Sequence, residues 1–271
     1  MWKLDDSKKT IIAGPCALES KKQLVTCIKH LKEEGVKIVR ASLWKPRTNP
    51  GWEGWGFYGI PMLLDETIKR NVVPATEIMT AIHAQMIVDA MRHFGKKAKF
   101  VVWVGARNQN HFELRRLSKI LSESPDNLYF MFKNQVWYDK KHWYGLFEHI
   151  IASGFPPERL IAVHRGFNPG YGENPEQLRN IPEYALCMEM KEKMKIPMYL
   201  DPSHIAGARD KVFRVVEQSL HYDFDGYLIE VHDNISVAKT DINQQLTFEQ
   251  LGHLRDMING KRTLEKDQLA A

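Results

Sequence analysis

The 271-residue sequence has no apolar run that approaches the roughly 20 residues needed to cross a membrane. Residues 1–10 are polar and charged instead of a basic start followed by an apolar stretch, so no secretory leader is indicated. Cysteine is scarce: Cys16, Cys27 and Cys187 are an odd number at unrelated spacings, which argues against a disulfide framework. These absences predict a soluble protein of a reducing, cytoplasmic environment.

The sequence also lacks low-complexity segments and linkers rich in proline, glycine and serine. Its 38 basic and 33 acidic residues leave a formal net charge of only +5, spread along the chain, which gives no case for nucleic acid. A hydrophobic content of 44% in a chain of this length is enough for a full core. We expect one domain over residues 1–271, with a lead-in at 1–9 and a polar tail at 259–271.

Short apolar segments alternate with helix-length stretches from end to end of the sequence. Eight of them are typical of strands buried on both faces: 10–16, 36–42, 72–78, 99–106, 127–134, 159–165, 197–203 and 226–232. Eight strand–helix units with right-handed crossovers curl a parallel sheet onto itself, so the pattern predicts a (β/α)8 TIM barrel. A doubly wound open sheet is the lesser alternative.

Four possible metal ligands each follow a strand-like segment, namely Cys16, His204, Glu230 and Asp241. In a parallel barrel the carboxyl ends of all strands meet on one face, so distant residues can surround one ion. A strand-end cysteine alone is more often a buried apolar residue. Together with imidazole and carboxylates, the thiolate suits Mn²⁺, Fe²⁺, Co²⁺ or Zn²⁺ and fits Mg²⁺ or Ca²⁺ poorly.

Basic residues also follow several of these segments: Arg40, Lys45, Arg107, Lys133 and Arg165. A single surface cation is usually only solvated, but several at the ends of different strands would repel one another unless they bind anions. The expected ligand is a small phosphorylated acid. Two long loops, 44–57 with three tryptophans and 166–179, follow strands on the same face, and we expect both to cover the site.

Seven motifs occur in the order of a known family: Gly14-Pro15-Cys16, Lys45-Pro46-Arg47-Thr48, Gly105-Ala106-Arg107, Phe132-Lys133-Asn134, His164-Arg165-Gly166, Asp201-Pro202-Ser203-His204 and Glu230-Val231-His232. On these motifs, which extend over residues 11–246, the chain resembles the 3-deoxy-7-phosphoheptulonate (DAHP) synthases. The resemblance implies condensation of phosphoenolpyruvate with erythrose 4-phosphate, the first step of the shikimate pathway to aromatic amino acids.

The resemblance also assigns roles to residues. It implies that Cys16, His204, Glu230 and Asp241 bind the metal and that Arg40, Lys45, Arg107, Lys133 and Arg165 hold phosphoenolpyruvate. Lys45, Pro46, Arg47, Thr48 and Asp201 would meet the sugar phosphate. Lys45, His204 and Cys16 are the expected catalytic residues, and Lys45, among other cations, is expected to have a lowered pKa and to donate a proton to the forming hydroxyl.

Two alternatives to this function remain at the level of sequence. One is a 3-deoxy-octulosonate 8-phosphate synthase or another enzyme that condenses phosphoenolpyruvate with a different aldose phosphate. The Lys45-Pro46-Arg47-Thr48 string favours the heptulonate enzymes, because the octulosonate enzymes carry a different pattern there. The other is a non-catalytic phosphoenolpyruvate-binding sensor. The sequence leaves no room for a regulatory domain, so we expect a homo-oligomer, dimer or tetramer, with any feedback control supplied from elsewhere, for example by a separate chorismate mutase.

Overall fold

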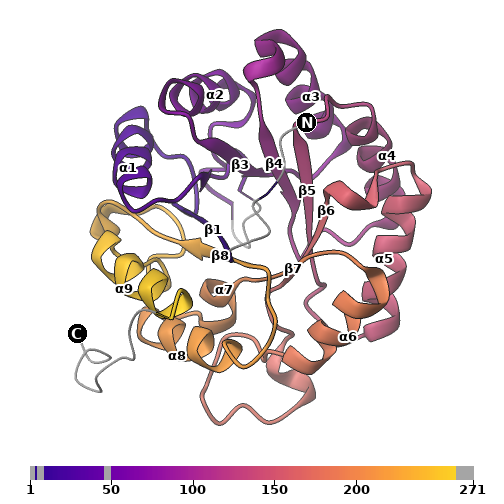
Figure 1. Ribbon diagram of the computed structural model, residues 1–271, viewed down its shortest axis with the longest axis vertical. Helices are drawn as coiled ribbons and strands as arrows, with labels where there is room; N and C mark the ends of the chain where they lie inside the picture. Colours follow the sequence, from indigo (N-terminus) through magenta and orange to yellow (C-terminus); the bar gives the residue numbers. More distant parts are fainter. Residues whose placement is uncertain (1–3, 5–8, 46–49, 261–271) are drawn as a thin grey trace.

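The computed structural model describes Leu4 and residues 9–45 and 50–260, and these form a closed barrel of parallel strands surrounded by helices (Figure 1). The strand order around the barrel is β1 to β8 in sequence order. The strands are β1 (Thr10–Gly14), β2 (Ile38–Arg40), β3 (Val73–Glu77), β4 (Phe100–Val104), β5 (Leu128–Lys133), β6 (Leu160–His164), β7 (Met198–Leu200) and β8 (Gly226–Glu230). β1 pairs in parallel with β8, which closes the barrel. The predicted (β/α)8 fold is confirmed.

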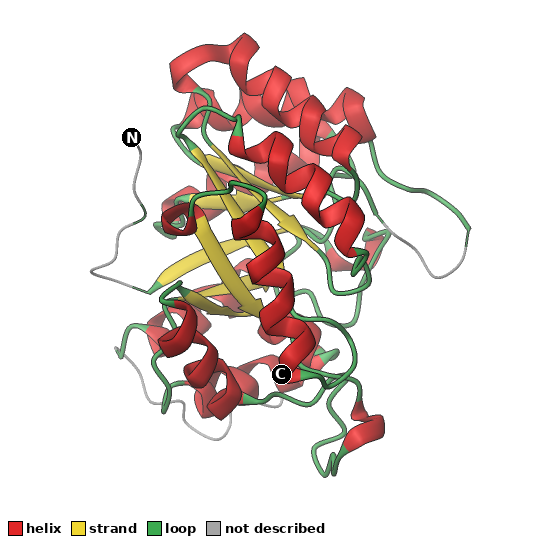
Figure 2. Ribbon diagram, turned by 90° about the vertical axis from the view of Figure 1, so that its right-hand side faces the viewer, coloured by secondary structure: helices red, strands yellow, loops and turns green. Residues whose placement is uncertain are grey.

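The helices lie outside the strands, as the red ribbons around the yellow sheet show in Figure 2. They are α1 (Lys21–Glu33), α2 (Gly59–Arg70), α3 (Ala81–Phe94), α4 (His111–Ser122), α5 (Lys140–Ala152), α6 (Tyr184–Met194), α7 (Pro202–Ala206), α8 (Arg209–Ser219) and α9 (Phe248–Ile258). No helix within the described residues is long and apolar enough to cross a membrane.

Alternation of side chains along each strand builds two cores. In β4, Val101 and Trp103 point into the barrel interior, whereas Phe100 and Val102 belong to the larger cluster between the strands and the helices. Strands that are buried on both faces need apolar residues at successive positions, which is the pattern that the sequence shows. The charged residues of the strands lie at the last strand positions, as Arg40, Glu77, Lys133 and Glu230 do, and the site forms there.

The segment 197–203 is shorter as a strand than its sequence suggested. β7 ends at Leu200, and Asp201 caps the short helix α7, with its side chain accepting a hydrogen bond from the His204 backbone N–H. Proline fits the first turn of a helix, and an aspartate before it satisfies a free N–H group. The expected extension of the strand to Ser203 is therefore wrong, and His204 projects from a helix at the end of β7.

Candidate active site

A cavity of about 960 Å³ opens at the carboxyl ends of the barrel strands. Cationic side chains that line it come from five segments of the barrel. They are Arg40, Lys45, Arg107, Lys133, Arg165, Arg179 and Lys239. All five basic residues expected at strand ends are among them. The structure thus brings together on one cavity the cations that the sequence scatters over 126 positions, from Arg40 to Arg165.

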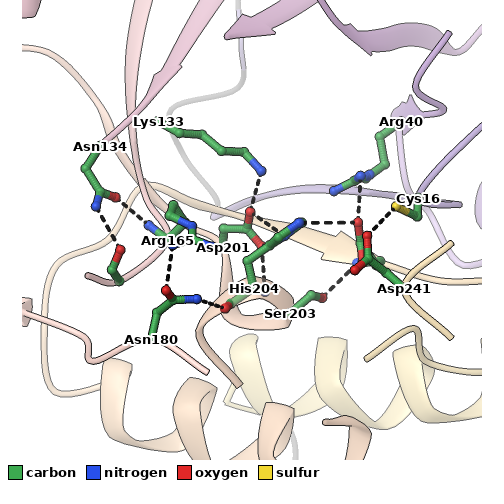
Figure 3. Close-up of polar contacts among 12 residues, drawn as sticks. Cys16, Arg40, Lys133, Asn134, Arg165, Asn180, Asp201, Ser203, His204 and Asp241 are labelled. Carbon is green, nitrogen blue, oxygen red and sulfur yellow. Dashed lines mark hydrogen bonds and ion pairs between the residues drawn. The ribbon is translucent and has the colours of Figure 1, made fainter. Parts of the chain in front are cut away.

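Three of the four expected metal ligands lie at one edge of this cavity. Potential ligand atoms of Cys16, Glu230 and Asp241 all lie within 4.8 Å of one another. The Cys16 thiol donates to Asp241 Oδ2 over 3.0 Å, as seen in Figure 3. Gly14 permits this arrangement, because a Cβ atom there would lie 2.2 Å from the backbone oxygen of Arg40. The tight β1–β2 approach therefore places Cys16 beside the end of β8.

His204, the fourth expected ligand, lies next to this group. Its Nε2 is 3.8 Å from Glu230 Oε1, and its Nδ1 is 2.9 Å from Asp201 Oδ2. Because the Asp201 carboxylate is the partner of Nδ1, that nitrogen carries a proton, and Nε2 is the nitrogen left to bind a metal ion. The ring is thus oriented so that Nε2 faces Glu230, one of the other candidate ligands.

Asp201 is fully buried beneath the cavity floor and does not line it. Lys133 Nζ lies 2.5 Å from its Oδ2, so this carboxylate joins Lys133 to His204. Burial by itself would raise the pKa of Asp201, but the charges of His204 and Lys133 hold it well below its usual range. Asp201 therefore stays ionised and fixes the positions of both neighbours.

Glu230 is held from two sides. Arg40 Nη2 lies 2.9 Å from its Oε1, and Gln244 Nε2 donates to its Oε2 over 2.6 Å. Arg40 is itself buried above the Trp103 ring, yet its Nε and Nη1 have no hydrogen-bond partner among the described residues. Buried polar groups are almost always paired, and a guanidinium fits carboxylate or phosphate oxygens well. Arg40 is therefore suited to bind an anion in the cavity.

The expectation of a lowered pKa for Lys45 is wrong. Its Nζ lies 3.0 Å from Cys16 Sγ. Burial favours the neutral amine, but the neighbouring groups Cys16, Glu77 and Glu230 together outweigh burial and raise the pKa of Lys45. In the sequence, the charged residue nearest to Lys45 is the cation Arg47. In the folded protein, acidic groups surround the Lys45 amine instead. Burial and the charge of Glu230 in turn raise the pKa of the Cys16 thiol well above its usual value.

The pKa of Arg165 is lowered, in contrast to that of Lys45. Burial, together with the neighbouring cations Arg179 and Arg107, lowers its pKa to about 10, so it remains protonated at neutral pH. Its Nη1 donates to Asn180 Oδ1 over 2.6 Å, and the Asn180 amide donates to the backbone oxygen of His204. One nitrogen of the Arg165 guanidinium is therefore held by Asn180, and the group lies near the cations Arg107 and Arg179.

The loops around the cavity differ in part from what the sequence predicts. Pro46, Arg47 and Thr48 lie outside the described residues. Of the loops expected to cover the site, the described parts contribute only Lys45 and Arg179 to the cavity lining. Apart from Asp241, residues 239–244 of the loop after β8 were not expected at the site, yet all of them line the cavity. The position of Asp241 inside this segment is the one signal that could have indicated it.

A parallel barrel with a cavity of polar and charged side chains at the carboxyl ends of its strands has the arrangement of the barrel enzymes. The family model described as DAHP synthetase I family matches residues 3–266. The chain therefore belongs to this family and is an enzyme, as its resemblance to the DAHP synthases implied.

Individual relatives agree with this assignment. The phospho-2-dehydro-3-deoxyheptonate aldolase of Thermotoga maritima is 29% identical over 249 residues, which cover 91% of this chain and 68% of the relative. A crystal structure of the Thermotoga maritima DAHP synthase is similar with a TM-score of 0.80 and 26% identity, covering 93% of this chain and 69% of that one. A truncated form from the same organism, at 24% identity, has a TM-score of 0.77 over 93% of this chain and 86% of its own, and supports the fold.

Proposed function

We propose that this enzyme condenses phosphoenolpyruvate with erythrose 4-phosphate and water to give 3-deoxy-7-phosphoheptulonate and phosphate. The observation that carries the proposal is that one cavity, lined by seven cationic side chains and by His204 and Asp241, adjoins the cluster of candidate metal ligands. The substrates together bring two phosphates and a carboxylate, which repel one another unless cations neutralise them. Family membership supplies the particular reaction.

Cys16, His204, Glu230 and Asp241 would hold a divalent ion. The donor set fits, because the thiol and both carboxylates already lie together and His204 Nε2 lies 3.8 Å from Glu230 Oε1. Sulfur and nitrogen donors favour Mn²⁺, Fe²⁺, Co²⁺ or Zn²⁺. When bound, such an ion acts as a Lewis acid that polarises the aldehyde of the sugar phosphate.

The cationic residues would hold phosphoenolpyruvate. Arg40 offers its two unpartnered nitrogens, and Arg165, Lys133 and Arg107 line the same cavity. A guanidinium group can bind two phosphate or carboxylate oxygens at once, which fixes the orientation of the substrate and neutralises its charge. Asp201, which the resemblance assigns to the sugar phosphate, is buried against Lys133 and His204, so we propose that it positions these two residues and does not touch the sugar.

Lys45 would supply the proton for bond formation. The methylene carbon of phosphoenolpyruvate attacks the aldehyde carbon, and the aldehyde oxygen takes up a proton to become a hydroxyl group. Water then adds to the neighbouring cationic carbon, and phosphate leaves from that carbon. The raised pKa of Lys45 keeps its amine protonated, which is the form that can donate.

An assay of phosphate release tests the proposal. Purified protein with Mn²⁺ would be supplied with phosphoenolpyruvate and either erythrose 4-phosphate or arabinose 5-phosphate. We expect release with erythrose 4-phosphate to exceed release with arabinose 5-phosphate. The reverse order would identify an octulosonate 8-phosphate synthase, and binding of phosphoenolpyruvate without release by either aldose would favour the sensor.

A further inference from the structure

Three loops meet at one side of the cavity mouth. β1 lies between β2 and β8 in the barrel, so the loops that follow these strands are neighbours. The loop after β1 carries Glu19, the loop after β2 carries Trp52 and Trp55, and the loop after β8 carries Lys239. The candidate metal ligands and the proposed anion-binding residues do not explain the role of the two tryptophans.

These residues are joined by specific contacts. The Lys239 ammonium lies 4.7 Å from the centroid of the Trp52 ring, and the Lys239 backbone N–H donates to Glu19 Oε1 over 2.8 Å. Trp55 Nε1 donates to the backbone oxygen of Glu19 over 3.1 Å. Both the main chain and the charged end of Lys239 are therefore fixed, which is unusual for a long surface side chain.

Lys239 is also placed to meet a ligand. It lines the cavity, whereas Trp52 does not, so the indole supports the ammonium from outside. None of the ion pairs among the described residues involves Lys239, and an aromatic ring does not neutralise its charge. The same loop as Trp52 carries Lys45, directly before the segment to which the family resemblance assigns the sugar phosphate.

We propose that Lys239 is a further substrate-binding residue, which contacts the phosphate of the aldose phosphate, and that Trp52 is its positioning residue. The inference rests on the proposed function for the identity of the aldose phosphate. A cation that an aromatic ring already orients loses less freedom on binding than a free lysine does. The contact would therefore discriminate between the two substrates, because the residues proposed above to hold phosphoenolpyruvate do not include Lys239.

Binding of erythritol 4-phosphate, an analogue without the reactive aldehyde, tests the proposal by calorimetry on the metal-loaded protein. Loss of one charged phosphate contact in Lys239→Met should weaken its binding about tenfold. Phosphoenolpyruvate binding should change less than about twofold. In turnover assays the same variant should raise the KM for erythrose 4-phosphate with little change in kcat, since the contact binds substrate and transition state alike.

The role of Trp52 is tested by a double-mutant cycle. Trp52→Leu removes the ring and should weaken analogue binding about threefold, while Trp52→Phe keeps a ring and should retain most of the affinity. If Trp52 acts through Lys239, Trp52→Leu has no further effect in the Lys239→Met background. Lys193 of α6 provides the control, because its ammonium lies 3.9 Å from the centroid of the Tyr144 ring of α5. Lys193→Met removes a similar pair outside the cavity and should leave analogue binding unchanged.

The outcomes separate this inference from the proposed function. Protein that binds the analogue but releases no phosphate contradicts the proposed function alone, and the titrations of the variants still decide the role of Lys239. Unchanged analogue binding in Lys239→Met overturns the inference, as does wild-type protein that does not bind the analogue. An equal effect of Trp52→Leu with and without Lys239 overturns the positioning role of Trp52.

Discussion

Arg165 and Arg159 stand at opposite ends of the same strand, β6, and both are buried. Arg165 faces the cavity, whereas Arg159 donates to the backbone oxygen of Pro125 and stacks on Phe155. We predict that Arg165→Ala costs on the order of 2 kcal/mol of phosphoenolpyruvate binding, which is at least about tenfold in affinity. Calorimetric titration would measure it. Arg159→Ala should reduce stability without changing the affinity, and equal affinities in the two variants would show that Arg165 does not contact this substrate.

His164, next to Arg165, is a buried histidine that stays neutral. Its Nε2 accepts the Glu183 backbone N–H over 2.9 Å, and burial together with the charge of Arg165 lowers its pKa to about 3. The unfolded chain has the ordinary pKa of about 6.5, so between these values it binds a proton that the folded protein cannot bind. Folding stability therefore decreases as the pH falls from 6.5 towards 3, by up to about 1.4 kcal/mol per pH unit.

We predict that His164→Gln removes this dependence, since glutamine still offers an oxygen to the Glu183 N–H. Between pH 6.5 and pH 5 the wild-type free energy of unfolding should decrease by about 1.5 kcal/mol more than that of the variant. Urea unfolding at several pH values would measure the difference. Parallel pH curves for the two proteins would mean that His164 is protonated in the fold.

At the scale of the element, α7 is short but positions two residues of the site. Asp201 caps this helix and holds His204 Nδ1, and it also pairs with Lys133. A carboxylate behind a ligating histidine fixes the ring and raises its basicity. Asp201→Asn keeps the shape and the cap but removes the charge, so we predict metal affinity about tenfold lower. Asp139, which caps α5 through the same spacing, is the matched control.

The comparison uses titration of the metal-free proteins with Co²⁺, followed by the absorbance of the cobalt–thiolate bond. Asp139→Asn makes the same change at a similar cap that does not line the cavity, so it should bind Co²⁺ like the wild-type protein. If Asp139→Asn and Asp201→Asn bind Co²⁺ equally well, the carboxylate behind His204 has no influence on the ion.

The elements themselves could be predicted from the sequence because their signals are local. Apolar runs such as 99–106 and 127–134 became β4 and β5, with the ends shortened by one or two residues. α7 was missed because five residues carry no periodicity, although Asp201-Pro202 is a helix start. The loop after β8 was missed for another reason. Asp241 has a left-handed backbone with φ 48 and contacts Arg179 from a distant loop, so tertiary contacts determine its place.

At the scale of the molecule, three of the candidate metal ligands lie where the first strand of the barrel meets the last. Cys16 follows the first strand, and Glu230 and Asp241 belong to the last strand and its loop. That these three residues lie close together could be predicted from sequence, because a parallel barrel must bring the ends of its first and last strands together. The electrostatics could not be predicted, since the pKa of Lys45 depends on Glu77 and Glu230, which are distant in the chain.

An ion at this position would link β1 to β8 and should stabilise the whole barrel. A ligand present at 100 times its dissociation constant stabilises the folded state by about 2.7 kcal/mol. For a domain of this size we predict that Mn²⁺ raises the Tm of chelator-treated protein by roughly 5–10 °C in differential scanning calorimetry. Cys16→Ala should abolish the increase, whereas Cys187→Ala, which removes an equally buried thiol in α6, should lower the baseline but keep the increase. The same increase in both variants would place the ion elsewhere, because an ion that does not need Cys16 cannot depend on the junction of the first and last strands.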